Sequence, residues 1–176
     1  YVQPSYYEHA QFREVARAIR ADVHPTPVLF AGRVNDPVVA EELLASGVCD
    51  LVAMTRAGIA DPDFARKARE GRLGEIRRCI GCNRCIGESI DQSVPAMFRK
   101  PVCSVNPVVG RELEWTARHR PASECKRVVV VGGGAAGLEV ARVAAGRGHK
   151  VVVLERGKAL GGQVNLAARA PGRDSF

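Results

Sequence analysis

Four cysteines form the group of residues in this chain best suited to carry chemistry. Cys79, Cys82 and Cys85 are each separated by two residues, and Cys103 follows after a gap of 17 residues. Two C-x-x-C steps that share a cysteine can hold three thiolates around one small inorganic core, and a fourth thiolate from a later loop closes the cage. The pattern predicts a [4Fe–4S] cluster, with structural zinc, disulfides or free thiols as alternatives.

The other two cysteines do not extend this group. Cys49 lies in an apolar stretch, residues 48–54, and is expected to be a small core residue. Cys125 lies in a polar segment without an evident partner. Because the chain has six cysteines in 176 residues, and three of them are bunched, a metal or cluster in a reducing compartment is favoured over a disulfide scaffold.

A glycine-rich turn is the second candidate for chemistry. Gly132, Gly134 and Gly137 follow an apolar strand expected over residues 128–131, and Glu155 ends the next strand. In this context the first glycine permits a tight turn, the second lets the backbone approach a pyrophosphate, and the third lets helix and strand pack closely. The following helix start supplies N–H donors. The pattern predicts a dinucleotide site in which Glu155 binds the adenosine ribose, the alternative being a structural turn.

Residues around and after Glu155 bear on the same site. A carboxylate at this position favours FAD or NAD over NADP, and Arg156 leaves NADP open. Gly161, Gly162 and Gln163 follow a few residues later, and their backbone could lie against a flavin or its pyrophosphate. An ordinary glycine turn is the alternative for this segment.

Two arginines form the third candidate group. Arg33 follows Gly32, Arg56 follows Thr55, and each pair comes directly after an apolar segment expected to be a strand. In a barrel of eight βα units, the loops after the seventh and eighth strands commonly bind phosphate. Backbone N–H groups with an arginine fork would suit an FMN phosphate, whereas ordinary surface arginines are the alternative.

Two strand–loop–helix units are expected to position these arginines. Uninterrupted apolar runs predict buried strands over residues 28–31 and 51–54, and apolar periodicity predicts a helix before them over residues 10–22. Such strands indicate a parallel sheet covered on both faces. Because two strands cannot form a stable sheet alone, more βα units are expected before Tyr1.

Both helices after these strands are expected to begin in the same way. Asp36 and Asp61 each precede a proline. An aspartate can cap the free N–H groups of a first turn, and proline fits that turn. The pattern predicts one helix that ends near Gly47 and another over residues 63–70.

The rest of the chain divides into less regular and more regular parts. Residues 79–107 show no clear periodicity and are expected to be loops organised by a cofactor. Residues 111–126 are read as a polar linker whose Trp115 covers a seam between domains. A small-residue helix is expected over residues 138–146 and a strand over 151–155.

Composition limits the classes of protein that remain. The net charge of +7 comes from scattered arginines rather than from a basic cluster interleaved with aromatics, so no nucleic-acid partner is expected. No apolar run reaches the roughly 18 residues of a membrane span, so no membrane association is expected. Neither end resembles a natural terminus, and the chain is read as an internal fragment of a cytoplasmic protein.

Taken in order, these motifs resemble one known family. The residues that carry the resemblance are Ile59-Ala60-Asp61-Pro62, Cys79-x-x-Cys82-Asn83-x-Cys85, Cys103 with Asn106-Pro107, and the glycine fingerprint from Gly132. They resemble the old yellow enzyme-related iron–sulfur flavoproteins, the NADH:flavin oxidoreductase group that includes trimethylamine dehydrogenase, N-methyl amine demethylases and 2,4-dienoyl-CoA reductase.

The resemblance implies an α/β chain made of parts of two domains. Residues 1–78 would be the C-terminal βα units of an FMN-binding TIM barrel, 79–110 a [4Fe–4S] segment, 111–126 a linker, and 127–176 the start of a Rossmann-like FAD- or NAD(P)-binding domain. The cluster ligands would be Cys79, Cys82, Cys85 and Cys103. The FMN phosphate loops would hold Gly32, Arg33, Thr55 and Arg56. The FAD or ADP contacts would come from Gly132, Gly134, Ala136, Gly137, Glu155, Gly162, Gln163 and Arg173.

Two features of the resemblance point to different substrates. The spacing between Cys82 and Cys85 is similar to that of the amine dehydrogenases, as is Thr55 in place of the usual glycine. The stretch from Gln163 to Gly172 resembles the reductase branch. The substrate is therefore expected to be an activated alkene such as an enoyl-CoA, or an N-methyl amine.

The implied activity is a flavoenzyme's electron transfer. In one direction NAD(P)H would reduce FAD, and electrons would pass through the cluster to FMN and a small substrate. In the other, electrons would leave for an acceptor such as an electron-transfer flavoprotein. The catalytic side chains are expected upstream, so the fragment alone would be inactive. A non-catalytic electron-transfer or flavin-binding module and a zinc-stapled NAD-binding protein are the alternatives.

Overall fold

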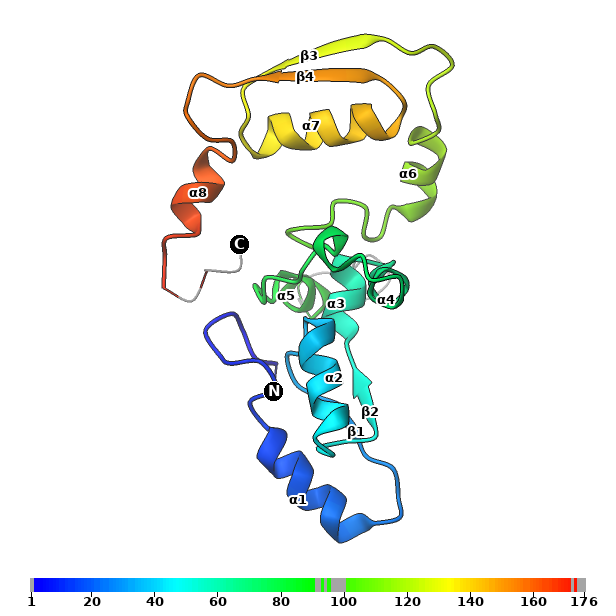
Figure 1. Cartoon of the computed structure of the whole chain (residues 1–176), viewed down its shortest axis with the longest axis vertical. Helices are drawn as coiled ribbons and strands as arrows, with labels where there is room; N and C mark the ends of the chain where they lie inside the picture. The colour runs from blue at the N-terminus through cyan, green and yellow to red at the C-terminus, as the bar shows by residue number, and fades with distance from the viewer. Residues whose placement is uncertain (1, 91–92, 94, 96–100, 172, 174–176) are drawn as a thin grey trace. The chain divides into compact units, whose positions relative to one another are not determined.

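The computed structural model describes residues 2–90, 93, 95, 101–171 and 173, and it divides into two compact units, Tyr1–Gly110 and Arg111–Phe176 (Figure 1). Both units mix helices with parallel strands. The elements of the first unit are α1 (Arg13–Val23), β1 (Leu29–Ala31), α2 (Pro37–Ala45), β2 (Leu51–Ala53), α3 (Thr55–Ala60), α4 (Phe64–Arg69), the 3₁₀ helix η1 (Leu73–Glu75) and α5 (Arg84–Ile90). Those of the second are α6 (Glu112–Arg118), β3 (Arg127–Val131), α7 (Ala135–Gly146), β4 (Lys150–Leu154) and α8 (Gln163–Ala167).

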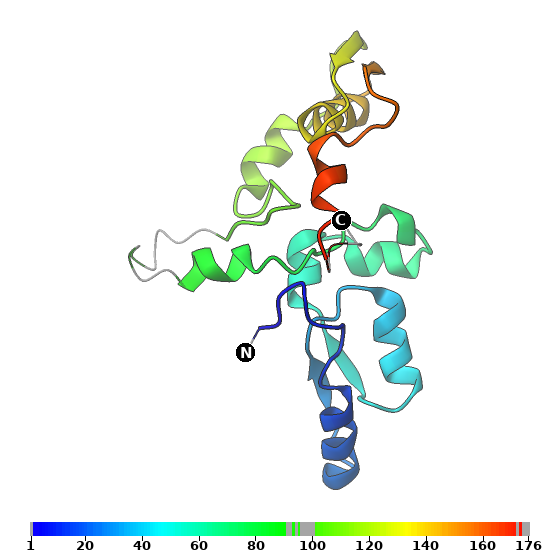
Figure 2. The ribbon, with the colours of Figure 1, turned by 90° about the vertical axis from the view of Figure 1, so that its left-hand side faces the viewer.

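Two parallel strands form the centre of the first unit. β1 pairs with β2 so that Leu29, Phe30 and Ala31 lie opposite residues 51–53. α2 connects the two strands and packs against β2, as Figure 2 shows. The strand–helix–strand order predicted from the apolar runs is therefore present, and it brings the carboxyl ends of β1 and β2 to the same edge.

The start of α2 matches the sequence prediction. The Asp36 carboxylate accepts a hydrogen bond from the Val38 N–H at 3.0 Å, and Pro37 occupies the first helical position. Asp61 behaves differently, because it does not cap the next helix. Its Oδ1 accepts from the Asp63 N–H, and α4 begins only after Asp63.

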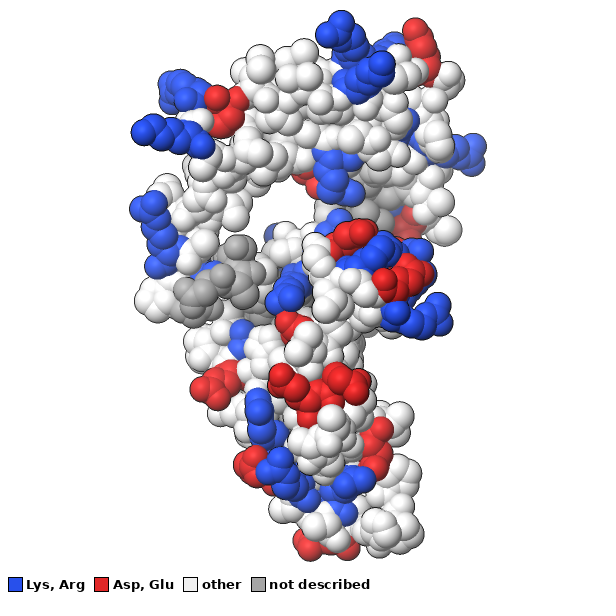
Figure 3. Space-filling model, in the orientation of Figure 1, with Lys and Arg blue, Asp and Glu red and all other residues white. Residues whose placement is uncertain are grey.

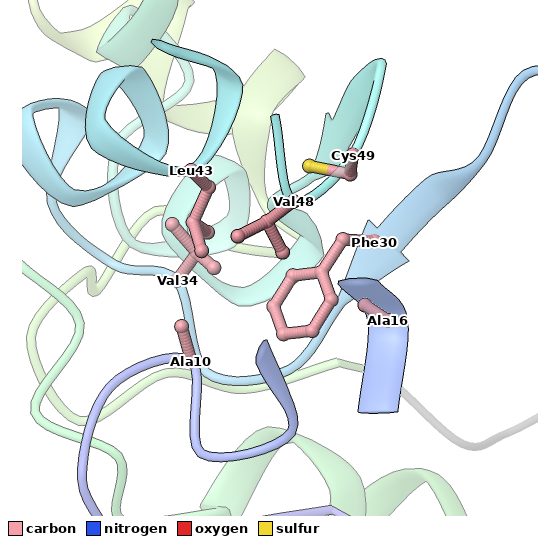
Figure 4. Close-up of a cluster of buried hydrophobic side chains, with 7 residues drawn as sticks. All are labelled: Ala10, Ala16, Phe30, Val34, Leu43, Val48 and Cys49. Carbon is pink, nitrogen blue, oxygen red and sulfur yellow. The ribbon is translucent and has the colours of Figure 1, made fainter. Parts of the chain in front are cut away.

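A small hydrophobic core lies between α2 and the strands (Figure 4). Its centre is formed by Phe30, Val34, Leu43 and Val48, which are all at most 4% exposed. Cys49 is 2% exposed in the same cluster, as the apolar stretch around it predicted. Burial also raises the pKa of the Cys49 thiol, which favours its neutral form.

The apolar side of α1 is largely exposed. Periodicity predicted this helix, but only Ala16 is buried, while Phe12, Val15 and Ile19 are between 42% and 57% exposed. The described sheet has two strands at this place. A two-stranded sheet gives an amphipathic helix too little apolar surface to cover its whole stripe.

Three short helices occur where loops were expected. α3 begins after the single residue Met54 that follows β2, so Thr55 and Arg56 open a helix rather than a loop. α5 lies inside the cysteine segment, and α6 lies inside the predicted linker. Each has six or seven residues, about two turns, so none repeats long enough to show a helical period in the sequence.

The second unit pairs β3 with β4 in parallel, with Val128 opposite Val151 and Val130 opposite Val153. These inward valines lie on the side covered by α7, which packs against both strands. Val131 points to the other side and is 83% exposed. Among the described residues of both units, no helix combines the length and apolar character needed to cross a membrane.

Charged side chains of both signs are interspersed on the face of the molecule shown in Figure 3. Many of the arginines form ion pairs within one helix or turn, such as Arg17 with Glu14 and Arg142 with Glu139. Exposed pairs of this kind contribute little to stability.

Candidate functional site

A cavity of about 480 Å³ lies at the carboxyl edge of β1 and β2. Gly32 and Arg33 enter it from the end of β1, and Thr55 and Arg56 enter it from the start of α3. The parallel register of the strands explains this meeting, because it places both strand ends at one edge of the sheet. The structure thus brings together the four residues predicted from the two strand-following pairs.

The electrostatics of this cavity favour an anion. Arg33 has a buried Nε with no hydrogen-bond partner among the described residues. Burial lowers the pKa of Arg33, and the nearby positive charge of Arg56 lowers it further. None of the described residues that line the cavity is an aspartate or a glutamate. Two guanidinium groups without a carboxylate are a setting that a phosphate would stabilise.

Arg56 is held in place from two sides. Its Nη1 donates to the Gln3 carbonyl at 2.7 Å and to the Asn83 side-chain oxygen. Asn83 in turn donates from Nδ2 to the Val2 carbonyl at 3.1 Å. Both Arg33 and Asn83 have positive φ angles, +50° and +58°, a conformation that non-glycine residues adopt rarely and often at functional sites.

Gln3 is a cavity residue that sequence reasoning missed. Its side chain is 2% exposed and its Nε2 has no hydrogen-bond partner among the described residues. The segment around it has no periodicity and no recognised motif. Only the folded arrangement shows that it lines the same cavity as Arg33 and Arg56.

The four predicted cysteines line one small pocket. Cys79, Cys82, Cys85 and Cys103 surround it together with Arg56 and other residues. Although Cys103 is distant in sequence, the fold brings it to the other three. Within the described ranges, no three or more Cys, His, Asp or Glu side chains are placed to hold a single metal ion. The four thiols therefore line a common pocket, but within the described ranges they do not converge on the position of a single metal ion.

Two of these sulfur atoms, those of Cys79 and Cys82, take part in hydrogen bonds. The Gly81 N–H donates to Cys79 Sγ at 3.4 Å, and the Cys82 thiol and the Ser104 hydroxyl are 3.3 Å apart. Burial raises the pKa of the Cys79 thiol; the Gly81 N–H opposes this shift, while the neighbouring Cys103 and Cys85 add to it. A bound metal centre would reverse this preference, because its positive charge stabilises thiolates.

Buried asparagines fasten the cysteine segment to the strand-end region. Asn35 donates to the Cys79 carbonyl at 3.1 Å, and Asn106 donates to the Ile59 carbonyl at 2.9 Å. Both side chains are at most 3% exposed. Their partners are more than 40 positions away in the chain, so no local pattern could reveal this role.

Asp61 supports the approach to the first cysteine. Its buried carboxylate accepts from Lys67 Nζ at 2.6 Å and from the Arg77 N–H at 2.9 Å, while Lys67 also donates to the Glu75 carbonyl. Burial alone would raise the pKa of Asp61, but the hydrogen bonds from Lys67 and the N–H groups of Arg77 and Asp63 outweigh burial and lower it. Asp61 thus remains ionised and fixes residues 75–77, just before Cys79.

The second unit contains the glycine-rich turn in the conformation that its spacing predicts. Gly132 has φ +99°, a value that favours glycine. A Cβ on Gly137 would come within 1.9 Å of the Gly132 carbonyl oxygen, so only glycine lets α7 pack here. A Cβ on Gly134 would meet no atom within 4 Å, and this open side is where a ligand could approach the backbone.

Glu155 binds the glycine-rich turn directly. Its two carboxylate oxygens accept from the Gly157 N–H at 2.6 Å and the Gly133 N–H at 2.7 Å. These two hydrogen bonds, the Gly157 bond first, lower the pKa of Glu155. The carboxylate therefore sits beside the turn, where a ribose-binding group was expected, and stays ionised.

The Gly161–Gly162 segment lies against the same turn. The Gly161 N–H donates to the Gly133 carbonyl at 2.7 Å. Gly162 has φ +53°, and a Cβ there would be 3.2 Å from the Gly134 Cα. This close approach favours glycine and makes the segment part of one backbone structure with the fingerprint.

The remaining predicted residues of this unit lie at its rim. Ala136 is exposed in the first turn of α7, and Gln163 is exposed at the start of α8. Arg173 follows α8, with its N–H bonded to the Ala170 carbonyl. Gly172, which was part of the reductase-like stretch, lies outside the described residues.

Two families of known proteins match the two parts of the chain. Residues 4–75 match the NADH:flavin oxidoreductase / NADH oxidase family, and residues 88–171 match the pyridine nucleotide-disulphide oxidoreductase family. The NADH oxidase of Thermoanaerobacter brockii is 42% identical over 173 residues, which are 98% of this chain and 26% of that protein.

Two solved structures share the fold of the chain. A 2-naphthoyl-CoA reductase in complex with 2-naphthoyl-CoA is 33% identical to this chain, with a TM-score of 0.89. The match covers 99% of this chain and 26% of the reductase chain. Histamine dehydrogenase from Rhizobium sp. 4-9 is 33% identical to this chain, with a TM-score of 0.84. The match covers 98% of this chain and 24% of the dehydrogenase chain. The chain spans about a quarter of the length of these relatives.

These matches define the class as flavin-type oxidoreductases that also have a nucleotide-binding half. Within that class, the chain belongs to the NADH:flavin oxidoreductase family, in the group related to old yellow enzyme and trimethylamine dehydrogenase. The resemblance predicted from the motifs is confirmed.

Proposed function

We propose that this chain forms the electron-transfer centre of an FMN/[4Fe–4S]/FAD oxidoreductase. Residues 1–78 would complete an FMN-binding TIM barrel, 79–110 would hold the cluster, 111–126 would link, and 127–176 would begin the FAD- or NAD(P)-binding domain. The proposal agrees with the family matches over residues 4–75 and 88–171.

One observation carries the proposal. The strand-end cavity and the cysteine pocket share Arg56, Ile59 and Cys85 in their linings. A flavin in the first place and a cluster in the second would therefore be neighbours, separated by side chains of the same segment. Close neighbours are what single-electron exchange between two cofactors requires.

The strand-end cavity fits the phosphate end of FMN. The N–H groups at Gly32 and Thr55 and the guanidinium groups of Arg33 and Arg56 would hold the phosphate. The partnerless Nε of Arg33 is the structural sign of this fit, because a buried donor without an acceptor is costly. FMN, when bound, would supply the hydride chemistry, and the chain's arginines would anchor it.

The cysteine pocket fits a [4Fe–4S] cluster by its donor set. Four thiols meet in one pocket, where the Gly81 N–H donates to Cys79 Sγ and the Cys82 thiol donates to the Ser104 hydroxyl oxygen. Hydrogen-bonding groups beside the sulfurs are typical of cluster sites. A cluster would supply one-electron transfer. The chain would fix the backbone of Cys79 through Asn35.

The glycine-rich turn fits the pyrophosphate and ribose of FAD or ADP. Gly134 offers an open backbone approach and Gly137 allows the helix start to lie close. Glu155 would bind the ribose in addition to the turn. Further contacts would come from Gly132, Ala136, Gly162, Gln163 and Arg173, and NAD(P)H would be the electron carrier that meets this domain.

Two substrate classes are supported by different relatives. A solved relative is a reductase in complex with an aromatic acyl-CoA, and another is an amine dehydrogenase. We therefore propose a small activated alkene or acyl-CoA, or an amine, as the substrate of the whole protein. In the dehydrogenase direction an electron-transfer flavoprotein would be the acceptor, and the compartment would be the cytoplasm.

The test uses the full-length protein, purified without oxygen. We expect iron and acid-labile sulfide in a ratio near one, together with FMN and FAD. Cys82→Ser should abolish the cluster iron, whereas Cys125→Ser, an exposed cysteine of the second unit, should leave it unchanged. Zinc without acid-labile sulfide would overturn the cluster proposal.

Substrate class is tested on the same preparation. An enoyl or aryl thioester should reoxidise the NAD(P)H-reduced flavin if the protein is a reductase, and a methylated amine should bleach the oxidised flavin if it is a dehydrogenase. Absorbance of the flavin in the visible range reports both reactions. A flavin that NAD(P)H reduces but neither substrate affects would favour a non-catalytic electron-transfer module.

A further inference from the structure

Gln3 carries an unexplained donor in the strand-end cavity. The side chain is 2% exposed, and its Nε2 has no partner among the described residues. Burying an amide N–H without an acceptor costs stability, so folded proteins rarely keep one without a use. The donor must therefore be explained by something that occupies the cavity.

The position of Gln3 is fixed by neighbours that follow β1 and β2 in the chain. A Cβ placed on Gly32 would lie 3.7 Å from Gln3 Nε2, so the amide is beside the first residue after β1. The Gln3 carbonyl accepts from Arg56 Nη1 at 2.7 Å, which ties the same residue to the start of α3. Gln3 thus lies between the two strand ends whose residues would hold a phosphate.

We propose that the Gln3 side-chain amide donates a hydrogen bond to the phosphate group of FMN in this cavity. The inference rests on the proposed function of the cavity as an FMN site. The phosphate is favoured over the flavin ring because Gln3 Nε2, Gly32, Arg33 and Arg56 are all donors or donor-bearing residues of one lining. A third side-chain donor would complete the shell around an anion with several acceptor oxygens.

The experiment compares two ligands that differ only in the phosphate. Full-length protein is freed of flavin and titrated with FMN and with riboflavin, and quenching of flavin fluorescence gives each Kd. Gln3→Met keeps the volume of the side chain and removes the donor. We expect FMN binding to weaken by roughly ten- to a hundredfold, the loss of one hydrogen bond to a charged acceptor, while riboflavin binding changes less than about threefold.

Two further variants sharpen the result. Gln3→Glu places a carboxylate beside the phosphate and should weaken FMN binding more than Gln3→Met does, because like charges repel. Gln11→Met changes an exposed glutamine near the start of α1 and should leave both affinities unchanged. The melting temperature of flavin-free Gln3→Met should not fall, because the side-chain Nε2 has no partner to lose among the described residues and the backbone carbonyl bound by Arg56 is kept.

Other outcomes would overturn the inference. An equal loss of FMN and riboflavin affinity would place the amide on the flavin or ribityl part, and unchanged affinities would leave it without a ligand. A lower melting temperature of the flavin-free variant would show a structural role. If the wild-type protein bound no FMN, the proposed function of the cavity would fail first, and this result is visible before any variant is made.

Discussion

In each of the two units the proposed place of a phosphate-bearing cofactor follows a parallel strand, but the two places are built from different parts of the chain. In the first unit the proposed donors are side chains, Arg33, Arg56 and Gln3, and Arg56 is oriented by hydrogen bonds to Gln3 and Asn83. In the second unit the proposed approach is made by the backbone of a glycine-rich turn, and Glu155 holds that turn by accepting a hydrogen bond from the Gly133 N–H. The proposed site of the first unit depends on charged and long side chains, and that of the second unit depends on the absence of side chains.

The difference matters for what each site tolerates. A backbone site fails when a side chain is added, because the added atoms occupy the space that the ligand or a neighbouring element needs. A side-chain site fails when a donor is removed or displaced, and its geometry depends on every residue that orients the donor. Substitutions of opposite kinds should therefore break the two sites.

Adding one methyl group to the second unit should have the largest effect. In Gly137→Ala the new Cβ would lie 1.9 Å from the Gly132 carbonyl oxygen, and backbone atoms cannot move aside as a side-chain end can. We expect the affinity of the full-length protein for FAD or ADP to fall by about a hundredfold or more, since overpacking costs on the order of 1–3 kcal/mol or above. Flavin content and a titration with ADP measure the loss.

The matched control is another glycine of the same helix. Gly146 ends α7, and a Cβ there would meet no atom within 4 Å. Gly146→Ala should leave nucleotide affinity unchanged and stabilise the helix slightly. An equal loss in both variants would show that the turn is not the sensitive element.

A change of donor shape in the first unit should come next. Arg56 donates from one guanidinium to the Gln3 carbonyl and to Asn83, and it lines both the cavity and the cysteine pocket. Lysine has one ammonium and no planar fork, so Arg56→Lys cannot keep these partners and also reach a phosphate. We expect FMN affinity to fall by roughly ten- to a hundredfold, together with a lower iron content per chain.

The control for this variant is the same arginine-to-lysine substitution at a position outside the cavity. Arg66 pairs with Asp63 on the exposed side of α4, and Arg66→Lys should change neither FMN affinity nor iron content. If Arg56→Lys lowered FMN affinity but left the iron content intact, the coupling between the cavity and the cysteine segment would be wrong, while the phosphate role would stand.

The same contrast explains what the sequence could predict. The glycine turn, Glu155 and the cap at Asp36 are local patterns, and the structure has each of them in the conformation expected. Residue type and spacing also singled out the cysteine group and the two arginine pairs, with zinc and surface arginines as the alternatives, and their chemistry stays a prediction. The meeting of the two arginine pairs in space followed from the predicted parallel strands.

What the sequence could not predict depends on contacts between distant positions. The link from Asn106 to Ile59 spans 47 positions, and that from Asn35 to Cys79 spans 44. Gln3 has no motif at all and is recognisable only as a buried donor without a partner. α3, α5 and α6 were missed because two turns of helix carry no detectable period. The exposed face of α1 was unexpected, because periodicity shows that a helix has an apolar side but not how much of it is covered.

The smallest of the expected effects tests the support of the cysteine segment rather than a donor. Asp61 binds Lys67 and the Arg77 N–H within a buried network. In Asp61→Asn the amide N–H₂ would face one of these donors, so we expect the free energy of unfolding to fall by about 1–2 kcal/mol at neutral pH. Urea denaturation of the full-length protein measures it. Asp63→Asn, in an exposed ion pair with Arg66, should change it by less than about 0.5 kcal/mol.

The pH dependence of this loss separates charge from shape. Because the pKa of Asp61 is lowered in the folded state, the carboxylate contributes its stability above the unfolded aspartate pKa of about 3.9 and loses it as the pH falls through the lower folded value. The stability difference between the wild type and Asp61→Asn should therefore be constant near neutrality and shrink below about pH 4. If the stability difference between the wild type and Asp61→Asn stayed constant below about pH 4, Asp61 would fix residues 75–77 by its shape and not by its charge. The first unit would then depend on shape, as the glycine-rich turn of the second unit does.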